Sequence, residues 1–304
     1  MRNSHHFWAI TSYYNPFRGN LRLSNYHNFR RNLTVPLITV EWSPEGKFDL
    51  KGNDADILIQ VSGGDILWQK ERLLNIALSH LPLSCKYTAW LDCDILLDDR
   101  DWQITAEKYL EKVDVIQLFE KVIYLKNYDA DLLSINIARQ LPSDYSVFSG
   151  VHAFFNGSLL HDMIFKSNPG LAYAARTEWL KNTGFYDAAI VGGGDTFLLF
   201  SILNKPEGIL SWPYSEEQKN HFKKWFDKIE SQPLLSYLPL TIYHMFHGDS
   251  KYRKYSDRHM ILTESNFDPA KHITLSDDNV WMWTKEGARI QSKVYKYMQS
   301  RLDS

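Results

Sequence analysis

The sequence predicts an α/β fold with a mixed, mostly parallel central sheet flanked by helices. Short apolar runs typical of buried strands recur along the first half of the chain, and amphipathic segments lie between them. Hydrophobic residues make up 44% of the 304, which is enough for a full core. Strands that alternate with helices favour a parallel sheet, which binds ligands at the carboxyl ends of its strands. We expect one domain over 1–265 and a peripheral helical extension over 266–304.

The first half of the chain is expected to supply most of the sheet. The segment 66–81 has apolar residues at helical spacing, with Asp65 as a plausible N-cap and Pro82 just past the end. The elements predicted in order are strand 7–12, helix 20–32, strand 35–42, strand 56–61, helix 66–81, strand 87–97, helix 102–112 and strand 114–119.

The second half has weaker patterns. The segment 143–157 is rich in Ser, Gly and aromatic residues and is predicted to be irregular. From Asp277 on we expect a peripheral helix that carries Trp281 and Trp283 near its start. The other elements predicted are helices over 174–182, 196–203 and 216–231 and a late strand over 240–246.

Composition excludes several classes of partner. The formal net charge of -2 and the isoelectric point near 6.6 do not favour general binding to nucleic acids or to a bilayer surface. Two cysteines, Cys85 and Cys93, support no disulfide framework and favour a reducing compartment. No apolar stretch approaches the ~20 residues of a membrane-spanning helix, and the first residues do not read as a signal peptide. We therefore expect a cytoplasmic protein.

Two carboxylates interrupt the apolar run predicted as strand 87–97. Asp92 and Asp94 are one residue apart, so an extended chain places them on one face, where both can approach one divalent cation. Oxygen ligands suit Mg²⁺ or Mn²⁺, and such a cation can neutralise the charge on a departing phosphate. A pair of solvated acids is the alternative, since short motifs recur by chance.

The helix before this strand carries cations near its start. Lys70 and Arg72 lie in its first two turns and Asn75 follows, where exposed amides and the helix dipole also favour an anion. This segment could hold a diphosphate. The alternative is a solvated face on which Glu71 pairs with its basic neighbours.

A triple glycine, residues 192–194, precedes Asp195 at a predicted helix start. Consecutive glycines leave room for a ligand to approach the main chain. A carboxylate held there can take a proton from an attacking hydroxyl. Asp195 could equally serve as an N-cap, and the two roles do not exclude each other.

A late segment, 244–259, joins imidazoles to basic side chains. His244 and His247 are acceptable Mn²⁺ ligands, and the cations can bind phosphate oxygens. A solvated basic turn is the alternative reading. The basic residues of the segment are Lys251, Arg253, Lys254 and Arg258, followed by His259.

Together and in this order, these segments resemble a glycosyltransferase of the GT-A fold, a Rossmann-like fold, over roughly residues 7–262. The run from Trp90 to Asp94 resembles the D-x-D motif of these enzymes, and the late histidine with its basic neighbours resembles their third metal ligand and phosphate-binding loop. The segment 169–195 resembles the acceptor-side region of galactosyl- and N-acetylgalactosaminyltransferases. The residues that match its Gly-Tyr-Asp and Gly-Gly-Glu/Asp elements are Gly184, Tyr186, Asp187, Gly193, Gly194 and Asp195.

The resemblance implies a nucleotide-sugar donor, such as a UDP-sugar, whose diphosphate binds through Mn²⁺ or Mg²⁺. Asp195 would then be the base that activates an acceptor hydroxyl on a carbohydrate or another molecule, with inversion at the sugar. Related enzymes with a similar Gly-Gly-acid element can retain the configuration, so retention is the alternative. The chain lacks the Trp and the acidic run of many galactosyltransferases, so the sugar is not implied. The acceptor and the oligomeric state are also left open. The implied metal ligands are Asp94, His244 or His247, and Asp92. The implied nucleotide contacts are Thr11, Ser12, Tyr13, Lys70, Arg72, Asn75, Asp92, Lys251 and Arg253.

Two other functions are compatible with parts of the pattern. A phosphatase of the haloacid dehalogenase type also has an Asp-x-Asp after an apolar strand, with the first Asp as nucleophile. Ten tryptophans and seventeen tyrosines would also suit a carbohydrate-binding protein without catalytic activity.

Overall fold

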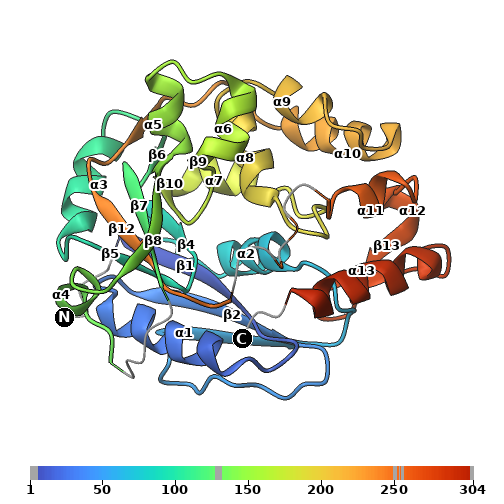
Figure 1. Cartoon of the computed structure of the whole chain (residues 1–304), viewed down its shortest axis with the longest axis horizontal. Helices are drawn as coiled ribbons and strands as arrows, with labels where there is room; N and C mark the ends of the chain where they lie inside the picture. The colour runs from blue at the N-terminus through green and yellow to red at the C-terminus, as the bar shows by residue number, and fades with distance from the viewer. Residues whose placement is uncertain (1–5, 127–131, 249–251, 253, 255–256, 302–304) are drawn as a thin grey trace.

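A computed structural model describes residues 6–126, 132–248, 252, 254 and 257–301 (Figure 1). Its central sheet has seven strands in the order β11-β6-β10-β4-β1-β2-β3. Four of the six strand pairs are parallel, and only β10 runs against its two neighbours. The predicted fold class, α/β with a mostly parallel central sheet, is confirmed. The strands are β1 (Phe7–Tyr14), β2 (Leu37–Ser43), β3 (Ile57–Ser62), β4 (Tyr87–Leu91), β6 (Val115–Gln117), β10 (Ala172–Arg176) and β11 (Leu235–Tyr237).

Helices cover both faces of this sheet (Figure 1). Alternation along β1 explains this, because Ile10 and Tyr14 point into one apolar cluster and Phe7 and Ala9 into the other. The first cluster includes side chains of α2, α7, α8, α10 and α13, and the second those of α1 and α3. The helices are α1 (Asn20–Asn32), α2 (Lys70–Ser79), α3 (Trp102–Leu110), α4 (Ile135–Ala138), α5 (Gly150–Phe155), α6 (Leu160–Lys166), α7 (Thr177–Thr183), α8 (Gly194–Ile202), α9 (Glu207–Leu210), α10 (Glu216–Phe226), α11 (Met260–Thr263), α12 (Pro269–His272) and α13 (Ala288–Ser300).

A second sheet brings distant segments beside the D-x-D motif. Its five strands have the order β5-β12-β7-β8-β9. Here β5 pairs antiparallel with β12, so that His244 lies opposite Ile95. The strands are β5 (Ile95–Leu97), β12 (Thr241–His244), β7 (Lys121–Leu125), β8 (Ser143–Ser149) and β9 (Ser167–Asn168), and a separate hairpin joins β13 (Ile273–Leu275) to β14 (Trp281–Trp283).

The predicted single strand over 87–97 is wrong. The chain leaves the central sheet after Leu91 and enters the second sheet at Ile95, so Asp92 and Asp94 lie in the link between two strands. The alternation of side chains that would place both carboxylates on one face ends with the strand.

Other predicted elements also need correction. The helix expected from 66 begins at Lys70 with Gln69 as its N-cap, and Asp65 instead accepts hydrogen bonds from Trp283 N and Gln291 Nε2. The segment 143–157 is regular, because pairing with β7 orders β8 and α5 follows. Residues 174–176 belong to a strand, since pairing with β4 and β6 overrides the helix propensity of alanine.

The C-terminal segment is less peripheral than predicted. Trp281 and Trp283 lie in a hairpin strand, and the helix starts at Ala288. Ile290 and Val294 of that helix belong to the same apolar cluster as Ile10 of the central strand β1. The domain boundary at 265 stays a prediction. No helix in the described part of the chain combines the length and the apolar character needed to cross a membrane.

Candidate active site

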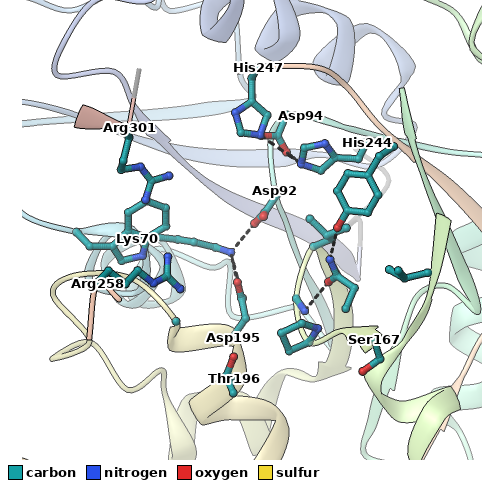
Figure 2. Close-up of a pocket in the computed structure, with 18 of the residues that line it drawn as sticks. Lys70, Asp92, Asp94, Ser167, Asp195, Thr196, His244, His247, Arg258 and Arg301 are labelled. Atoms are coloured by element: carbon teal, nitrogen blue, oxygen red, sulfur yellow. Dashed lines mark hydrogen bonds and ion pairs between the residues drawn. The ribbon is translucent and has the colours of Figure 1, made fainter. Parts of the chain in front are cut away.

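A cavity of about 530 Å³ lies at the carboxyl ends of β1 and β4, between the two sheets and the start of α8. Ligands bind at this edge of a parallel sheet because the chain turns away there and exposes polar groups. Figure 2 shows that Lys70, Asp92, Asp94, Asp195, His244 and His247 converge on this one space, although they are up to 177 positions apart in the sequence.

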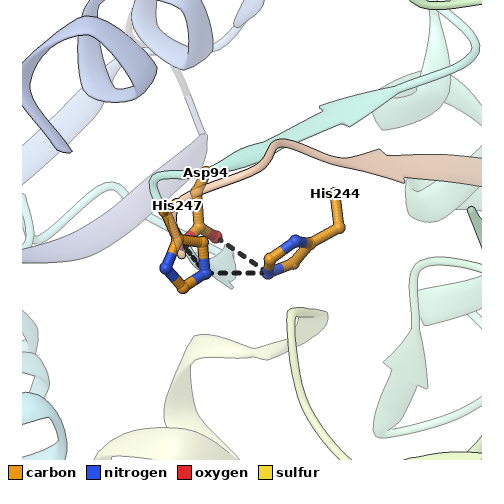
Figure 3. Close-up of side chains that lie close together, drawn as sticks. All are labelled: Asp94, His244 and His247. Atoms are coloured by element: carbon orange, nitrogen blue, oxygen red, sulfur yellow. Dashed lines mark hydrogen bonds and ion pairs between the residues drawn. The ribbon is translucent and has the colours of Figure 1, made fainter. Parts of the chain in front are cut away.

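Asp94, His244 and His247 form a compact group with metal-ligand chemistry (Figure 3). One ligand atom from each lies within 4.8 Å of the others. The Nε2 atoms of the two imidazoles are 3.3 Å apart, and His247 Nε2 is 3.2 Å from Asp94 Oδ2. The pairing of β5 with β12, together with a hydrogen bond from Met245 N to Asp94 O, fixes this approach. The sequence left open which histidine belongs to the site, and the structure places both there.

This group fits a divalent cation. Asp94 Oδ1 is buried and has no hydrogen-bond partner among the described residues. An anionic oxygen in that position is costly without a compensating charge. One carboxylate and two imidazoles suit Mn²⁺ better than Mg²⁺, which prefers oxygen ligands. The identity of the cation stays a prediction.

Asp92 lies outside this group, and its role as a metal ligand stays a prediction. Its Oδ1 is 2.6 Å from Lys70 Nζ. The same Nζ lies 3.0 Å and 2.9 Å from the two carboxylate oxygens of Asp195. Lys70 therefore joins the first acid of the D-x-D motif to the acid after the glycines (Figure 2).

The charges of this part of the cavity depend on one another. Burial alone would lower the pKa of Lys70, but Asp195 and Asp92 outweigh it and hold that pKa well above its usual range. Burial raises the pKa of Asp92, and Asp195 and Asp94 raise it further against the opposing effect of Lys70. One ammonium group therefore does not balance the carboxylates around it, and an additional cation would stabilise their charged forms.

The glycine turn sets the position of Asp195. Gly193 is the N-cap of α8 with φ +99°, so Asp195 is the second residue of the helix and not its N-cap. A Cβ on Gly194 would lie 2.2 Å from the carboxyl carbon of Glu71, and a Cβ on Gly170 would lie 2.5 Å from Asp195 Cγ. Glycine at 170 leaves room for the Asp195 side chain, and glycine at 194 leaves room for Glu71 beside the first turn of α8.

Only one of the three predicted nucleoside contacts on β1 faces the cavity. The strand continues to Tyr14, so Ser12 and Tyr14 line the cavity on one face. Thr11 and Tyr13 point to the other face and do not line the cavity, so their contact with a nucleoside stays a prediction. Thr11 donates a hydrogen bond to Leu91 O, and Tyr13 donates one to Asp49 Oδ2.

Arg72 and Asn75 do not line the cavity either. Arg72 Nη1 is 3.1 Å from Asp187 Oδ2, and Asn75 donates to the same oxygen at 3.0 Å. Residues two positions apart on a helix face different directions, so Arg72 cannot share the cavity with Lys70. Their observed role is to fix the segment before the glycines. Lys251 and Arg253 lie outside the described residues.

Sequence reasoning missed several residues of the cavity wall. Arg301 comes from the end of the last helix, and Trp68 precedes α2. Tyr124 stacks on Tyr145 with ring centroids 4.4 Å apart, and both line the cavity. No motif marks these residues, because each reaches the site only through the packing of its own element.

Comparisons with known proteins give a fold-level result. The sequence matches no protein-family model and none of the curated protein sequences. The structure neighbours include GT-A-type glycosyltransferases, as the motifs predicted.

Three of these neighbours cover most of the chain. The 1–349 fragment of S. aureus TarS is 12% identical and covers 97% of this chain and 71% of that one, with a TM-score of 0.42. The mannosyltransferase PcManGT from Pyrobaculum calidifontis, solved with GDP-Man and Mn²⁺, is 15% identical, with 98% and 72% coverage and a TM-score of 0.43. The catalytic domain of Drosophila β1,4-galactosyltransferase 7, solved with xylobiose, is 12% identical, with 94% and 97% coverage and a TM-score of 0.43.

Proposed function

We propose that this chain is a metal-dependent glycosyltransferase that moves a sugar from a UDP-sugar to an acceptor hydroxyl. One observation carries the proposal: the Asp94–His244–His247 group and Asp195 share a cavity and are linked through Asp92 and Lys70. Sugar transfer needs both parts, a site for the diphosphate and a base for the acceptor.

Asp94, His244 and His247 would hold Mn²⁺, which when bound supplies positive charge for the donor diphosphate. Lys70 would place a second positive charge beside the oxygen of the departing diphosphate. Ser12 and Tyr14 line the cavity at the end of β1, where they would contact the nucleoside.

Asp195 would take the proton of the acceptor hydroxyl. The acceptor oxygen then forms a bond to the anomeric carbon, and the bond from that carbon to the diphosphate breaks, with the electron pair leaving on the nucleotide. Attack from the side opposite the leaving group inverts the sugar. The ion pair with Lys70 holds Asp195 in place, and a carboxylate has further lone pairs that can accept a hydrogen bond from the acceptor hydroxyl.

Binding of UDP tests the metal and nucleotide half of the proposal. We expect UDP to raise the melting temperature only when Mn²⁺ is present, because ligand binding to the folded state stabilises it. No shift with UDP and Mn²⁺, in a protein that is well folded, would contradict the proposal. Release of phosphate from simple phosphoesters would favour the phosphatase alternative.

Asp195→Asn tests the base. We expect the variant to lose transfer by about 10²-fold or more, the usual contribution of a general base, while it binds UDP with Mn²⁺ like wild type. Normal turnover in this variant would remove Asp195 from the role. The anomeric configuration of the product, read by NMR, tests inversion.

A further inference from the structure

Two buried arginines lie on one side of the cavity, apart from the Asp94–His244–His247 group. Arg258 and Arg301 are only 8% and 3% exposed, and both line the cavity. Figure 2 shows them on the flank of Lys70 that faces away from His244. A guanidinium group stays charged at every pH at which proteins are folded, so both side chains bring a positive charge to this part of the cavity.

Arg258 is held against the turn that leads to Asp195. Its Nη1 would lie 2.9 Å from a Cβ on Gly192, and its Nη2 3.5 Å from a Cβ on Gly193. Both glycines have positive φ, +91° and +99°, and their lack of side chains makes room for the guanidinium group. Arg258 therefore lies against the turn that leads to the candidate base.

A neutral histidine orients Arg258. Arg258 Nε donates to His259 Nε2 at 3.3 Å, and His259 Nδ1 lies 2.9 Å from the Tyr214 hydroxyl. Burial, with the charge of Arg258, lowers the pKa of His259 to about 3. His259 thus accepts from Arg258 on one nitrogen and donates to Tyr214 from the other.

Arg301 completes the pair from the end of the chain. Its guanidinium carbon lies 4.5 Å from the centre of the Trp68 ring, and Nη1 donates to the Tyr297 hydroxyl at 3.5 Å. Trp68 also lies 3.6 Å from the Cβ position of Gly192, so the tryptophan contacts both Arg301 and the glycine turn against which Arg258 is held. Stacking fixes the plane of the Arg301 guanidinium group.

The donor diphosphate has other partners in this cavity. The Asp94–His244–His247 group and Lys70 serve it in the proposed function, whereas Arg258 lies on the glycine turn beside the base, where the acceptor must enter. Trp212, whose ring centroid is 4.8 Å from that of His259, also lines the cavity and offers a face on which a sugar can stack.

We propose that Arg258 and Arg301 bind a negatively charged group of the acceptor, a phosphate or a carboxylate, so that the acceptor is an acidic sugar. This inference rests on the proposed function. Planar guanidinium groups bind either anion through paired hydrogen bonds, which fixes the orientation of the acceptor hydroxyl toward Asp195.

The test compares three probes by NMR titration: glucose, glucose 6-phosphate and glucuronate. The protein is the full chain, saturated with UDP and Mn²⁺. In wild type we expect at least one charged probe to bind about tenfold more tightly than glucose, as suits charge-assisted hydrogen bonds. Whichever charged probe binds more tightly identifies the anion as phosphate or carboxylate.

Variants assign the preference to the arginines. Arg258→Gln and Arg301→Gln should each reduce the affinity of the charged probe, relative to glucose, to about threefold or less. The affinity for UDP should stay near that of wild type. Arg289→Gln is the matched control, since it removes the same charge from an exposed position on α13. It should leave the ratio unchanged, and near-native circular dichroism spectra should show that all three variants fold.

Three results would overturn the inference. Wild type could bind neutral and charged probes with equal affinity, or both arginine variants could keep the preference for the charged probe. The variants could also lose affinity for UDP while they keep that preference. The last would assign the arginines to the donor. If wild type does not bind UDP at all, the proposed function fails, and the same titrations without UDP still decide whether the arginines bind an anion.

Discussion

At the scale of single residues, the two acids of the D-x-D motif contact different groups. Asp94 lies beside the imidazoles of His244 and His247. Asp92 pairs with Lys70, which also pairs with Asp195. The two acids therefore belong to different parts of the site, and their substitution should have different consequences.

Asp94→Asn should weaken Mn²⁺ binding by about tenfold or more, because an amide oxygen supplies no charge to the cation. Titration of Mn²⁺ followed by electron paramagnetic resonance measures this. Asp277→Asn, an exposed acid far along the chain, is the control and should bind Mn²⁺ like wild type. Equal affinity in both variants would remove Asp94 from the metal site.

Lys70 and Asp195 should be coupled in stability. Lys70→Met leaves two neighbouring carboxylates without their shared cation, so we expect a loss of about 2–4 kcal/mol in the free energy of unfolding. Adding Asp195→Asn should recover part of that loss, because one of the two stranded charges is removed. Urea unfolding of the two single variants and the double variant measures the coupling. Additive losses would show that the ion pair contributes nothing to stability.

At the scale of elements, the junction of α2 with α8 sets the geometry around Asp195. Glu71 of α2 is buried against Gly194, the first residue of α8, and its Oε1 has no hydrogen-bond partner within the described ranges. Burial raises the pKa of Glu71 to about 8, opposed by Lys70 and assisted by Asp195 and Asp92. Burial therefore favours the neutral form of Glu71 at this junction.

Gly194→Ala should disturb this junction. The new methyl group would meet Glu71 at 2.2 Å, so we expect a loss of about 1–3 kcal/mol in the free energy of unfolding, as for other overpacked sites. Gly52→Ala is the control, since its Cβ would have no neighbour within 4 Å. Thermal and urea unfolding measure both. Equal stability of the two variants would mean that α8 can shift away from α2 without cost.

At the scale of the whole molecule, the cavity wall joins the beginning, middle and end of the chain. Ser12, His247 and Arg301 all line it. A group that is buried in this assembly, and exposed when the chain unfolds, couples the stability of the fold to pH.

His259 should make the protein less stable in mild acid. Its pKa is lowered to about 3 in the folded state, from 6.5, so it takes up a proton between pH 6.5 and 3 only on unfolding. Between pH 7 and pH 5 this lowers the free energy of unfolding by about 2 kcal/mol, because each pH unit below 6.5 contributes about 1.4 kcal/mol. Urea unfolding at the two pH values should show a smaller loss in His259→Asn than in wild type. The same loss in both would show that His259 does not control this pH dependence.

The sequence by itself determined the fold class and most strands and helices of the first half. It also pointed to residues that the structure brings to one cavity: Asp94, the two histidines, Lys70 and Asp195. Those signals are local, because hydrophobic periodicity and short motifs depend on neighbours in the chain. Only the tertiary structure decided which acid lies beside the imidazoles and that Arg301 reaches the cavity. It also decided which predicted side chains do not line the cavity: Thr11, Tyr13, Arg72 and Asn75. The physical reason is that these outcomes depend on pairing between distant strands, such as β5 with β12, and on where a strand ends, which sets the direction of every side chain that follows.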